Sequence, residues 1–245
     1  MTTTFRVYGT EFCRVLGAIA LFQASPRAFE SLAAVRCFAR YDGLSLIAIN
    51  GASIAVGHVE AEDIDEPAVF SIPAAQVKAI LAIFNRHLPK DASSMEYVLE
   101  VTVTDRQVRI HDVSDLFERD EYLMAITATE DLEAREQSDA ERAMGAAATA
   151  MSALRATDPF DLADGVYFSH DEIARMARAA KLLTLELHLR PAGRFLVAAL
   201  ADDFVAMTVA QRHDRDPEKP RIFIDEQALR SWRGRLDELV DQAVL

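Results

Sequence analysis

Three stretches of the chain share one pattern of apolar and polar positions, in which a short apolar strand runs directly into an amphipathic helix. They read "SIPAAQVKAIL" at 71–81, "YFSHDEIARMA" at 167–177 and "FIDEQALRSWR" at 223–233. Aligned without gaps on the last strand residue, the three copies have coinciding apolar helix positions. A chance match between ordinary strand–helix junctions explains the third copy as well as a true repeat does. It explains the first two less well, because hairpin patterns also follow both of them.

The segments around these units predict further strands. Residues 3–8 predict a strand, and Thr10 is suited to cap the helix that follows it. Three β-rich runs within 34–61 are separated by "YDG" and "NGAS", which are typical of hairpin turns. The fold class predicted is therefore α+β, with antiparallel sheets backed by helices. Other strands are predicted within 97–113, 121–127 and 184–212.

Residues 128–165 differ in composition from the rest of the chain, being first acidic and then rich in alanine. Ser138 and Glu141 form a capping-box pattern, which predicts a helix over about 139–155. We place a domain boundary near the start of this stretch. The prediction is a first domain over 1–127 and a second over 128–245.

The predicted helices carry basic residues on the side opposite their apolar stripe. In the second strand–helix copy, the stripe that is expected to be buried consists of Ile173, Met176 and Ala177. Ordinary surface charge explains any single helix of this kind, but agreement among several favours a shared role. The outward basic residues are Arg14 on the first helix, Lys78 and Arg86 after it, then Arg175, Arg178 and Lys181, and finally Arg230 and Arg233.

The composition is that of a globular protein with an acidic balance. The 245 residues have a net charge of -13, which argues against a simple DNA-binding domain, since those are usually basic. The location of the positive residues matters more than their sum. No apolar run is long enough to span a membrane, and the N-terminus lacks a signal-peptide pattern, which predicts a cytoplasmic protein. Cys13 and Cys37 lie in apolar contexts that predict buried thiols.

Motifs for catalysis are absent from the sequence. There is no phosphate-binding glycine loop, no C-x-x-C and no H-E-x-x-H, so we expect no enzyme activity, no cofactor and no metal. The "SHDE" at 169–172 is better explained as a helix start, with Ser169 as the cap and two carboxylates near the positive end of the helix dipole.

Two long stretches resemble the DNA polymerase sliding clamps. "GLSLIAINGASIAVGHVEA" followed by "AVFSIPAAQVKAILAIF" is similar to the middle of a clamp domain, and "DGVYFSHDEIARMARAAKLL" with the strands after it is similar to the latter half of one. The resemblance covers most of 1–127 and 165–212. Residues 156–164 are too few for the three strands that precede the second helix of a complete domain. The second domain is therefore expected to be reduced or rewired, with an extra C-terminal strand–helix unit.

The resemblance implies a non-enzymatic processivity factor. Clamp domains join head to tail in a ring whose helices line a channel around duplex DNA, and a chain of two domains implies a homotrimer. The outward basic residues named above would then face DNA without reading its sequence. DNA polymerase and the clamp loader would dock through short peptides. The candidate pocket for these peptides consists of Leu116, Phe117, Tyr122 and Met124, although a plain core explains these residues better.

Two other functions remain open from the sequence. One is an oligomeric interaction or structural protein of similar fold that does not bind DNA. The other is a small-molecule enzyme whose site is assembled from scattered residues, which a pocket with a strongly perturbed carboxylate or histidine would support.

Overall fold

The computed structural model describes residues 2–27, 32–85, 97–114, 120–126, 166–192, 195–200, 203–209 and 211–212. The chain divides into two units. The first comprises Met1–Asp161 and Phe168–Ala210, and the second comprises Leu162–Tyr167 and Gln211–Leu245. In the second unit the described part is an antiparallel pair, β10 (Val166–Tyr167) with β14 (Gln211–Arg212).

The first unit contains an antiparallel sheet with the strand order β5-β1-β7-β8-β9. Burial alternates along strand β1: Thr3, Phe5 and Val7 are buried while Thr2 and Arg6 are exposed, so one face of the strand packs on the core. In the β7–β8 turn, the Thr104 hydroxyl accepts a hydrogen bond from the Gln107 N–H at 3.1 Å, which favours the tight reversal. The strands are β1 (Thr2–Tyr8), β5 (Ala61–Glu62), β7 (Val98–Thr104), β8 (Gln107–Asp112) and β9 (Glu121–Ala125).

A seven-stranded antiparallel sheet, in the order β11-β12-β13-β4-β3-β2-β6, forms the rest of the β structure of this unit. Both predicted hairpins between 34 and 61 are confirmed. Gly43 and Gly51 take positive φ values of 132° and 94° at the two turns, which glycine adopts without strain. The strands are β2 (Ala34–Arg40), β3 (Gly43–Ile49), β4 (Ser53–Val59), β6 (Ala68–Pro73), β11 (His188–Ala192), β12 (Phe195–Leu200) and β13 (Phe204–Val209).

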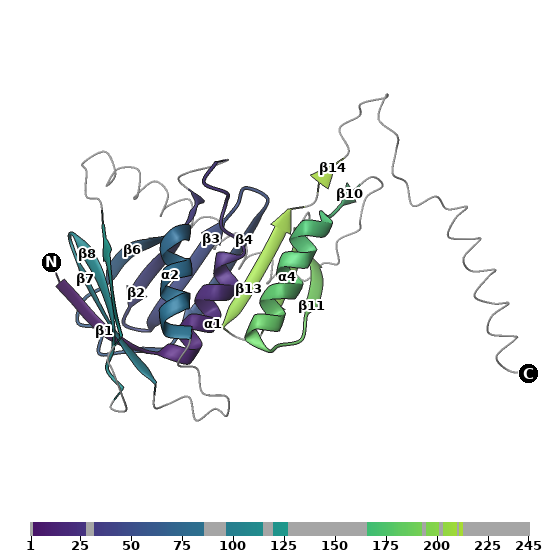
Figure 1. The fold of residues 1–245 in the computed structure, drawn as a ribbon. Coiled ribbons are helices and arrows are strands. Elements are labelled where there is room, and N and C mark those ends of the chain that lie inside the picture. Colours follow the sequence, from purple (N-terminus) through teal and green to yellow (C-terminus); the bar gives the residue numbers. More distant parts are fainter. Residues whose placement is uncertain are drawn as a thin grey trace, which may run out of the picture. The chain divides into compact units, whose positions relative to one another are not determined.

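Strands from the two halves of the sequence meet in this sheet. Strand β13 pairs with β4, with Met207 opposite Ile54 and Phe204 opposite Gly57. The backbone N–H of His58 also donates to the Asp203 carbonyl at 2.8 Å. The predicted strands of 184–212 are confirmed, and they extend the sheet that the strands of 34–73 begin (Figure 1).

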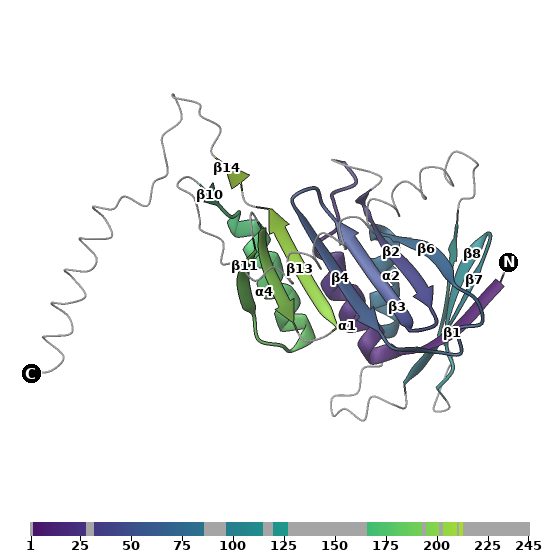
Figure 2. The same cartoon turned by 180° about the vertical axis from the view of Figure 1, so that it is seen from behind.

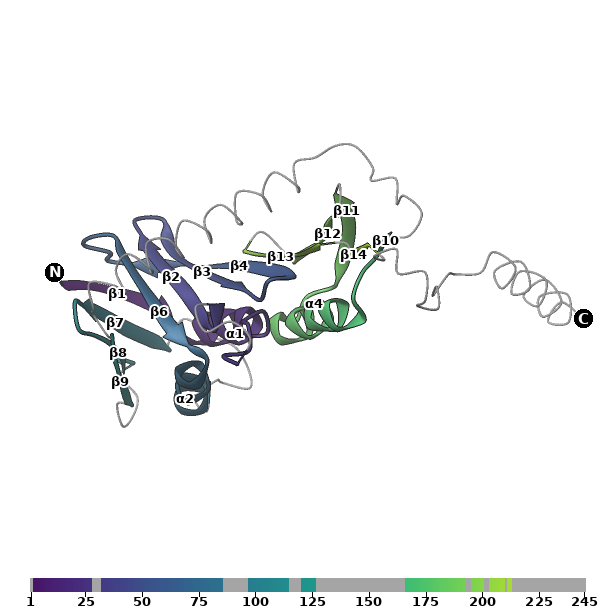
Figure 3. The same ribbon diagram turned by 90° about the horizontal axis from the view of Figure 1, so that it is seen from above.

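Three helices in the described part of the chain lie on one face of the seven-stranded sheet. They are α1 (Gly9–Ala20), α2 (Ala74–Phe84) and α4 (His170–Leu183). Figures 1 and 3 show them side by side on that face, with α1 between α2 and α4, and α1 contacts both of its neighbours. Phe12, Leu16 and Ile19 of α1 are at most 1% exposed, so the core lies between the helices and the sheet.

The start of α1 differs from the prediction. The N-cap residue is Tyr8, and Thr10 lies inside the first turn, where its buried hydroxyl has no hydrogen-bond partner among the described residues. The backbone N–H of Gly9 instead donates to the Tyr97 carbonyl at 2.8 Å. A Cβ at position 9 would lie 2.4 Å from the Tyr97 ring. Tertiary packing against Tyr97, rather than a polar cap, therefore sets where this helix begins.

The other two helix starts lie close to their predicted places. Pro73 is the N-cap of α2, at the predicted junction of strand and helix. Ser169 is the N-cap of α4 as predicted, but its side chain makes no capping hydrogen bond. On α4 the stripe is rotated from the prediction. Met176 is buried, Ile173 is half-buried and Ala177 is exposed, because the buried side continues instead through Glu172, Ala179 and Ala180.

Candidate nucleic-acid interface

The three helices form a closely packed layer, α2–α1–α4, on one face of the sheet. Leu81 of α2 and Leu182 of α4 approach Gly17 of α1 from its two sides. A Cβ at that position would lie 3.7 Å from Leu81 Cδ1 on α2 and 4.0 Å from Leu182 Cδ1 on α4. The side chains that these helices turn away from the sheet therefore lie on a common surface.

Charge on this helical layer is segregated. Acidic residues occur only in the first turns, at Glu11 of α1 and at Asp171 and Glu172 of α4, where they favour the positive end of the helix dipole. Beyond the first turn every charged residue of the three helices is basic. In a chain with 39 acidic and 26 basic residues this is a local reversal of sign. These basic residues are Arg14, Lys78, Arg175, Arg178 and Lys181.

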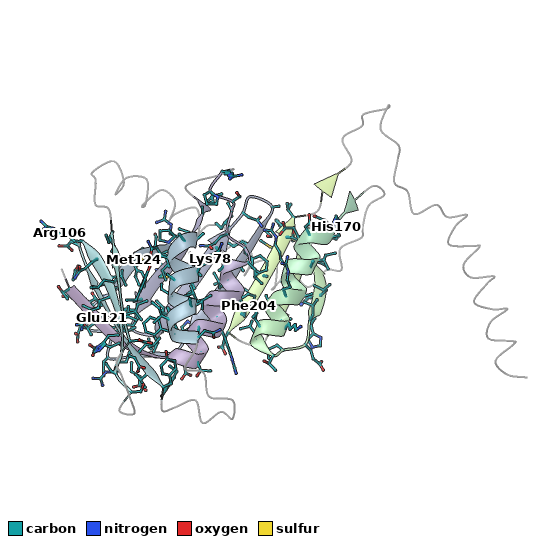
Figure 4. All side chains as sticks on the ribbon, viewed as in Figure 1. Lys78, Arg106, Glu121, Met124, His170 and Phe204 are labelled. Carbon is teal, nitrogen blue, oxygen red and sulfur yellow. The ribbon has the colours of Figure 1, made fainter. Side chains whose placement is uncertain are left out.

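Four of the predicted DNA-facing residues are exposed on this layer. Arg14 lies on α1, Lys78 on α2 (Figure 4), and Arg178 and Lys181 on α4. The Arg178 Nε donates to the Ala174 carbonyl of its own helix at 3.3 Å, which leaves the rest of its guanidinium open to solvent. The remaining predicted positions Arg86, Arg230 and Arg233 lie outside the described residues.

Arg175 is placed differently from the prediction. Its side chain is only 29% exposed and lies with its Nε 3.7 Å from a carboxylate oxygen of Glu172, one helical turn earlier. The Arg175 Nη1 also donates to the Leu21 carbonyl at 3.5 Å, beyond the end of α1. The charge of Arg175 is therefore matched within the protein, and this residue joins α4 to α1 instead of extending outward.

A buried polar cluster lies next to Arg175. Glu172 is 6% exposed and accepts hydrogen bonds from the Ser53 hydroxyl and from Asn50 Nδ2, the latter at 3.3 and 3.4 Å to its two oxygens. The Asn50 Oδ1 in turn accepts from the backbone N–H groups of Ala52 and Ser53 at 2.9 and 2.8 Å. The cluster therefore fixes the N-terminal end of α4 to the turn between β3 and β4.

Sequence reasoning missed this cluster. It explained Glu172 by the helix dipole alone, which accounts for an acidic residue at that position without any partner. Asn50 and Glu172 are 122 residues apart, and no local pattern links them.

A second acidic group lies near the N-terminal end of α1. Burial is the largest cause that raises the pKa of Glu11, and the carboxylates of Glu60 and Asp203 raise it further. The backbone N–H of Glu60 and the ring of His58 act in the opposite direction. This group does not amount to a metal centre, because no set of three or more His, Cys, Asp or Glu residues in the described ranges is arranged to hold an ion.

The structure describes two of the four residues of the candidate peptide pocket. Met124 is 3% exposed and belongs to the main hydrophobic core, so it does not line a surface pocket. Tyr122 is partly buried against the same core, and its hydroxyl hydrogen-bonds to Gln76 Oε1 on α2. Leu116 and Phe117 lie outside the described residues.

The cysteines are core residues. Cys13 and Cys37 are both buried free thiols, as predicted. Burial raises the pKa of Cys13 to about 12 and also raises that of Cys37, so neither is a thiolate near neutrality.

Comparison with solved structures identifies the architecture. The β subunit of DNA polymerase III from Thermotoga maritima matches 90% of this chain and 68% of its own, with a TM-score of 0.53 and 12% identity. The fold is that of the sliding clamps. The DNA polymerase sliding clamp of Bacillus subtilis matches 90% of this chain and 67% of its own, with a TM-score of 0.52 and 9% identity. A putative DNA polymerase III β subunit from Eubacterium rectale matches 93% of this chain and 67% of its own, with a TM-score of 0.53 and 8% identity.

The likeness to sliding clamps holds for the fold and not for the sequence. No protein-family model matches the chain, and no curated protein matches it. The α+β clamp architecture expected from the resemblance is confirmed. In the ranges that the structure describes, no helix is both long and apolar enough to cross a membrane.

Proposed function

We propose that this chain is a DNA sliding clamp, or a clamp-like processivity factor, that encircles duplex DNA and has no catalytic activity of its own. The observation that carries the proposal is the basic surface of the α2–α1–α4 layer in a chain of net charge -13. An acidic protein whose helical layer carries only basic charges beyond its first turns is suited to face phosphates there and to repel them elsewhere. Contacts of this kind exchange easily and do not read bases, so they permit sliding.

Encirclement requires several copies of the chain. We infer a homotrimer, because the chain has the length of about two clamp domains. Strand β4 already has neighbours on both sides, β3 and β13, so it is not a free edge for pairing between chains. The outermost strands of the two sheets are β5 and β9 and β11 and β6, and of these we propose β9 and β11 for head-to-tail pairing. Pro191 of β11 has no N–H to donate and limits the possible pairings there.

The mass in solution tests the ring. Light scattering on the full chain is expected to give three times the chain mass of 27.1 kDa. A monomer at all concentrations would contradict encirclement.

DNA binding is tested by reversing charge on the helical layer. The double variant Arg178→Glu/Lys181→Glu should lose retention on closed circular duplexes, to a similar extent on any sequence. If each residue contacts one phosphate, the slope of log affinity against log salt should flatten by about 2. The matched control is Arg40→Glu/Arg106→Glu. Arg40 is exposed at the end of β2 and Arg106 is exposed in the β7–β8 turn, and Figure 4 shows Arg106 well away from the three helices.

The outcomes of the charge-reversal test separate the alternatives. Equal losses in both double variants would mean a general charge effect and would contradict a DNA-facing helical layer. Equal retention of the unmodified chain on DNA-cellulose and on plain resin at low salt would favour an interaction protein that does not bind DNA. Loss confined to one DNA sequence would indicate a site-specific binder.

Partner proteins belong to the same proposal. DNA polymerase and clamp loader would bind the ring through short peptides, and Leu116, Phe117 and Tyr122 remain the proposed contacts. Substituting Tyr122 by Ala should then weaken capture of a polymerase by the chain while leaving its retention on circular DNA unchanged.

A further inference from the structure

The seven-stranded sheet is apolar on both faces. The face away from the helices carries a band of apolar side chains that crosses five strands, which we call the outer band. Its members lie opposite one another: Ile47 faces Val56, Met207 faces Ile54, and Val197 faces Met207. The outer band consists of Phe38 on β2, Ile47 and Ile49 on β3, Ile54 and Val56 on β4, Val205 and Met207 on β13, and Phe195 and Val197 on β12.

The outer band is a separate layer from the main core. Alternate residues of the same strands, such as Cys37, Leu46 and Ala55, belong to the main core beneath the helices. Because successive side chains of a strand point to opposite faces, the outer band lies on the other side of the sheet. Figure 2 views the molecule from that side, with the strands in front of the helices.

The burial of the outer band requires a cover. Five of its side chains are almost inaccessible: Val197 is 0% exposed, Ile47 2%, Ile54 4%, and Phe38 and Met207 5%. Neighbours within a single layer shield the flanks of such side chains but not their tips. The described helices all lie on the opposite face (Figures 2 and 3). The described helices therefore leave these tips uncovered.

The sequence contains a segment suited to this position. The capping box at Ser138 predicts a helix over 139–155. In a helix, the spacing of four, three, four and three residues places one apolar stripe on a single side, with Arg142 and Thr149 opposite. Small residues in the stripe allow close approach to a flat sheet. The stripe consists of Ala140, Met144, Ala147, Met151 and Leu154.

Length and connection favour the same segment. A helix over 139–155 is about 25 Å long at 1.5 Å per residue. The five strands of the outer band span about 19 Å at a spacing of about 4.8 Å. The segment is tethered at both ends, since it leaves β9 at Ala125 and must return to β10 at Val166. That tether gives it a higher effective concentration at the sheet than a separate molecule has.

We propose that residues 139–155 form an amphipathic helix that packs on the outer band of the same chain. The seven-stranded sheet is then enclosed between helices on both faces. This assignment is independent of DNA binding, which concerns the opposite face. It also means that the outer band is not the surface on which a polymerase or loader docks.

Cross-linking within one chain tests the proposal. Val56→Cys places a thiol at the centre of the outer band, on β4. It is combined in turn with Met144→Cys, Ala147→Cys or Met151→Cys, and each pair is treated with a short bis-maleimide. The native Cys13 and Cys37 do not compete, because both are buried. At least one pair is expected to cross-link within a single chain, read from the linked peptides by mass spectrometry. In the matched control Val56→Cys/Thr149→Cys, the yield of the cross-link should be no higher than background.

Two results would overturn the proposal. One is cross-links only between isotopically distinct chains, which would assign the cover to a second copy. The other is no cross-link in any pair while both thiols react freely with a monofunctional maleimide, which would leave the face open for another protein.

A second measurement guards against misfolded cysteine variants. Met207 in the outer band is a native reporter, and its oxidation by hydrogen peroxide should be slow in the unmodified chain at every protein concentration. Met151→Asp should make Met207 oxidation several-fold faster, and Thr149→Asp should not. Unchanged protection of Met207 in Met151→Asp would contradict the assignment of this helix.

Discussion

At the scale of single residues, the sequence predicts the conformation of a residue best where its neighbours in the chain determine that conformation. Gly43 and Gly51 were predictable as turn residues because a hairpin turn needs a positive φ. Glu172 and Arg175 were not, because their partners come from Asn50, Ser53 and Leu21. The helical spacing of apolar residues places Arg175 outside the apolar stripe. That spacing does not show that the neighbouring Glu172 carboxylate is buried and pairs with Arg175.

Removal of the Glu172 carboxylate should loosen α4. Glu172→Ala leaves the amide of Asn50 and the hydroxyl of Ser53 buried without their acceptor, and the charge of Arg175 without its partner. Hydrogen bonds to a charged group contribute about 1.5–3 kcal/mol, so we expect a loss of about 2 kcal/mol in the free energy of unfolding, measured with urea. The control is Asp171→Ala. It removes an exposed carboxylate from the same helical turn and should cost less than about 1 kcal/mol. Similar losses in the two variants would contradict the role of the buried cluster.

The pKa of Glu11 predicts a pH dependence with a definite sign. A raised pKa means that the folded chain binds this proton more tightly than the unfolded chain, so ionisation of Glu11 costs stability as pH rises through the raised pKa. Glu11→Gln should therefore unfold at a higher urea concentration than the unmodified chain at neutral pH. The difference should shrink as pH falls below the ordinary glutamate value of 4.5. Glu66→Gln, at an exposed loop position, is the control and should show little difference at either pH.

At the scale of elements, the hairpins and helices were predictable, while their pairing across the chain was not. Alternation and turn residues define β2, β3 and β4, and the 3.6-residue spacing of apolar side chains defines α1. That β13 lies beside β4 depends on how two distant hairpins pack on the same helices. Local patterning contains no information about that contact. The predicted boundary near residue 128 stays a prediction, because the chain there lies outside the described residues.

Contact between α1 and β4 depends on Gly57. A Cβ at that position would lie 2.5 Å from Val15 Cγ1 and 3.3 Å from Ile19. Gly57→Ala should therefore overpack this contact and cost about 1–3 kcal/mol of unfolding free energy. Val15→Ala removes the clashing methyl group, so the double variant should lose less than the sum of the two single losses. Additive losses in this cycle would show that the helix does not approach the strand so closely.

At the scale of the whole molecule, net charge and fold led to opposite expectations about DNA. The charge of -13 argues against DNA binding when it is treated as a sum. The distribution reverses that argument, because the layer of three helices is basic beyond its first turns. Two local patterns in the sequence, the strand–helix unit and its outward basic residues, were enough to predict the clamp fold. They were not enough to show that the two halves share one sheet and one core.

The shared sheet predicts that the two halves unfold together. Phe204 of β13 packs against Phe22, beyond the end of α1, with ring centroids 6.4 Å apart, and it is 4% exposed (Figure 4). Phe204→Ala removes a buried ring from the contact between halves and should cost about 3–5 kcal/mol. If β4 and β13 belong to one cooperative unit, hydrogen exchange in urea should show peptides from 34–59 and from 195–209 losing protection at the same concentration, before and after the substitution. In Phe204→Ala, the urea concentration at which half of the protection is lost should fall for both sets of peptides. Peptides from 34–59 that keep their original midpoint in Phe204→Ala would show instead that the N-terminal half is stable alone and that β13 is an appendage to its sheet.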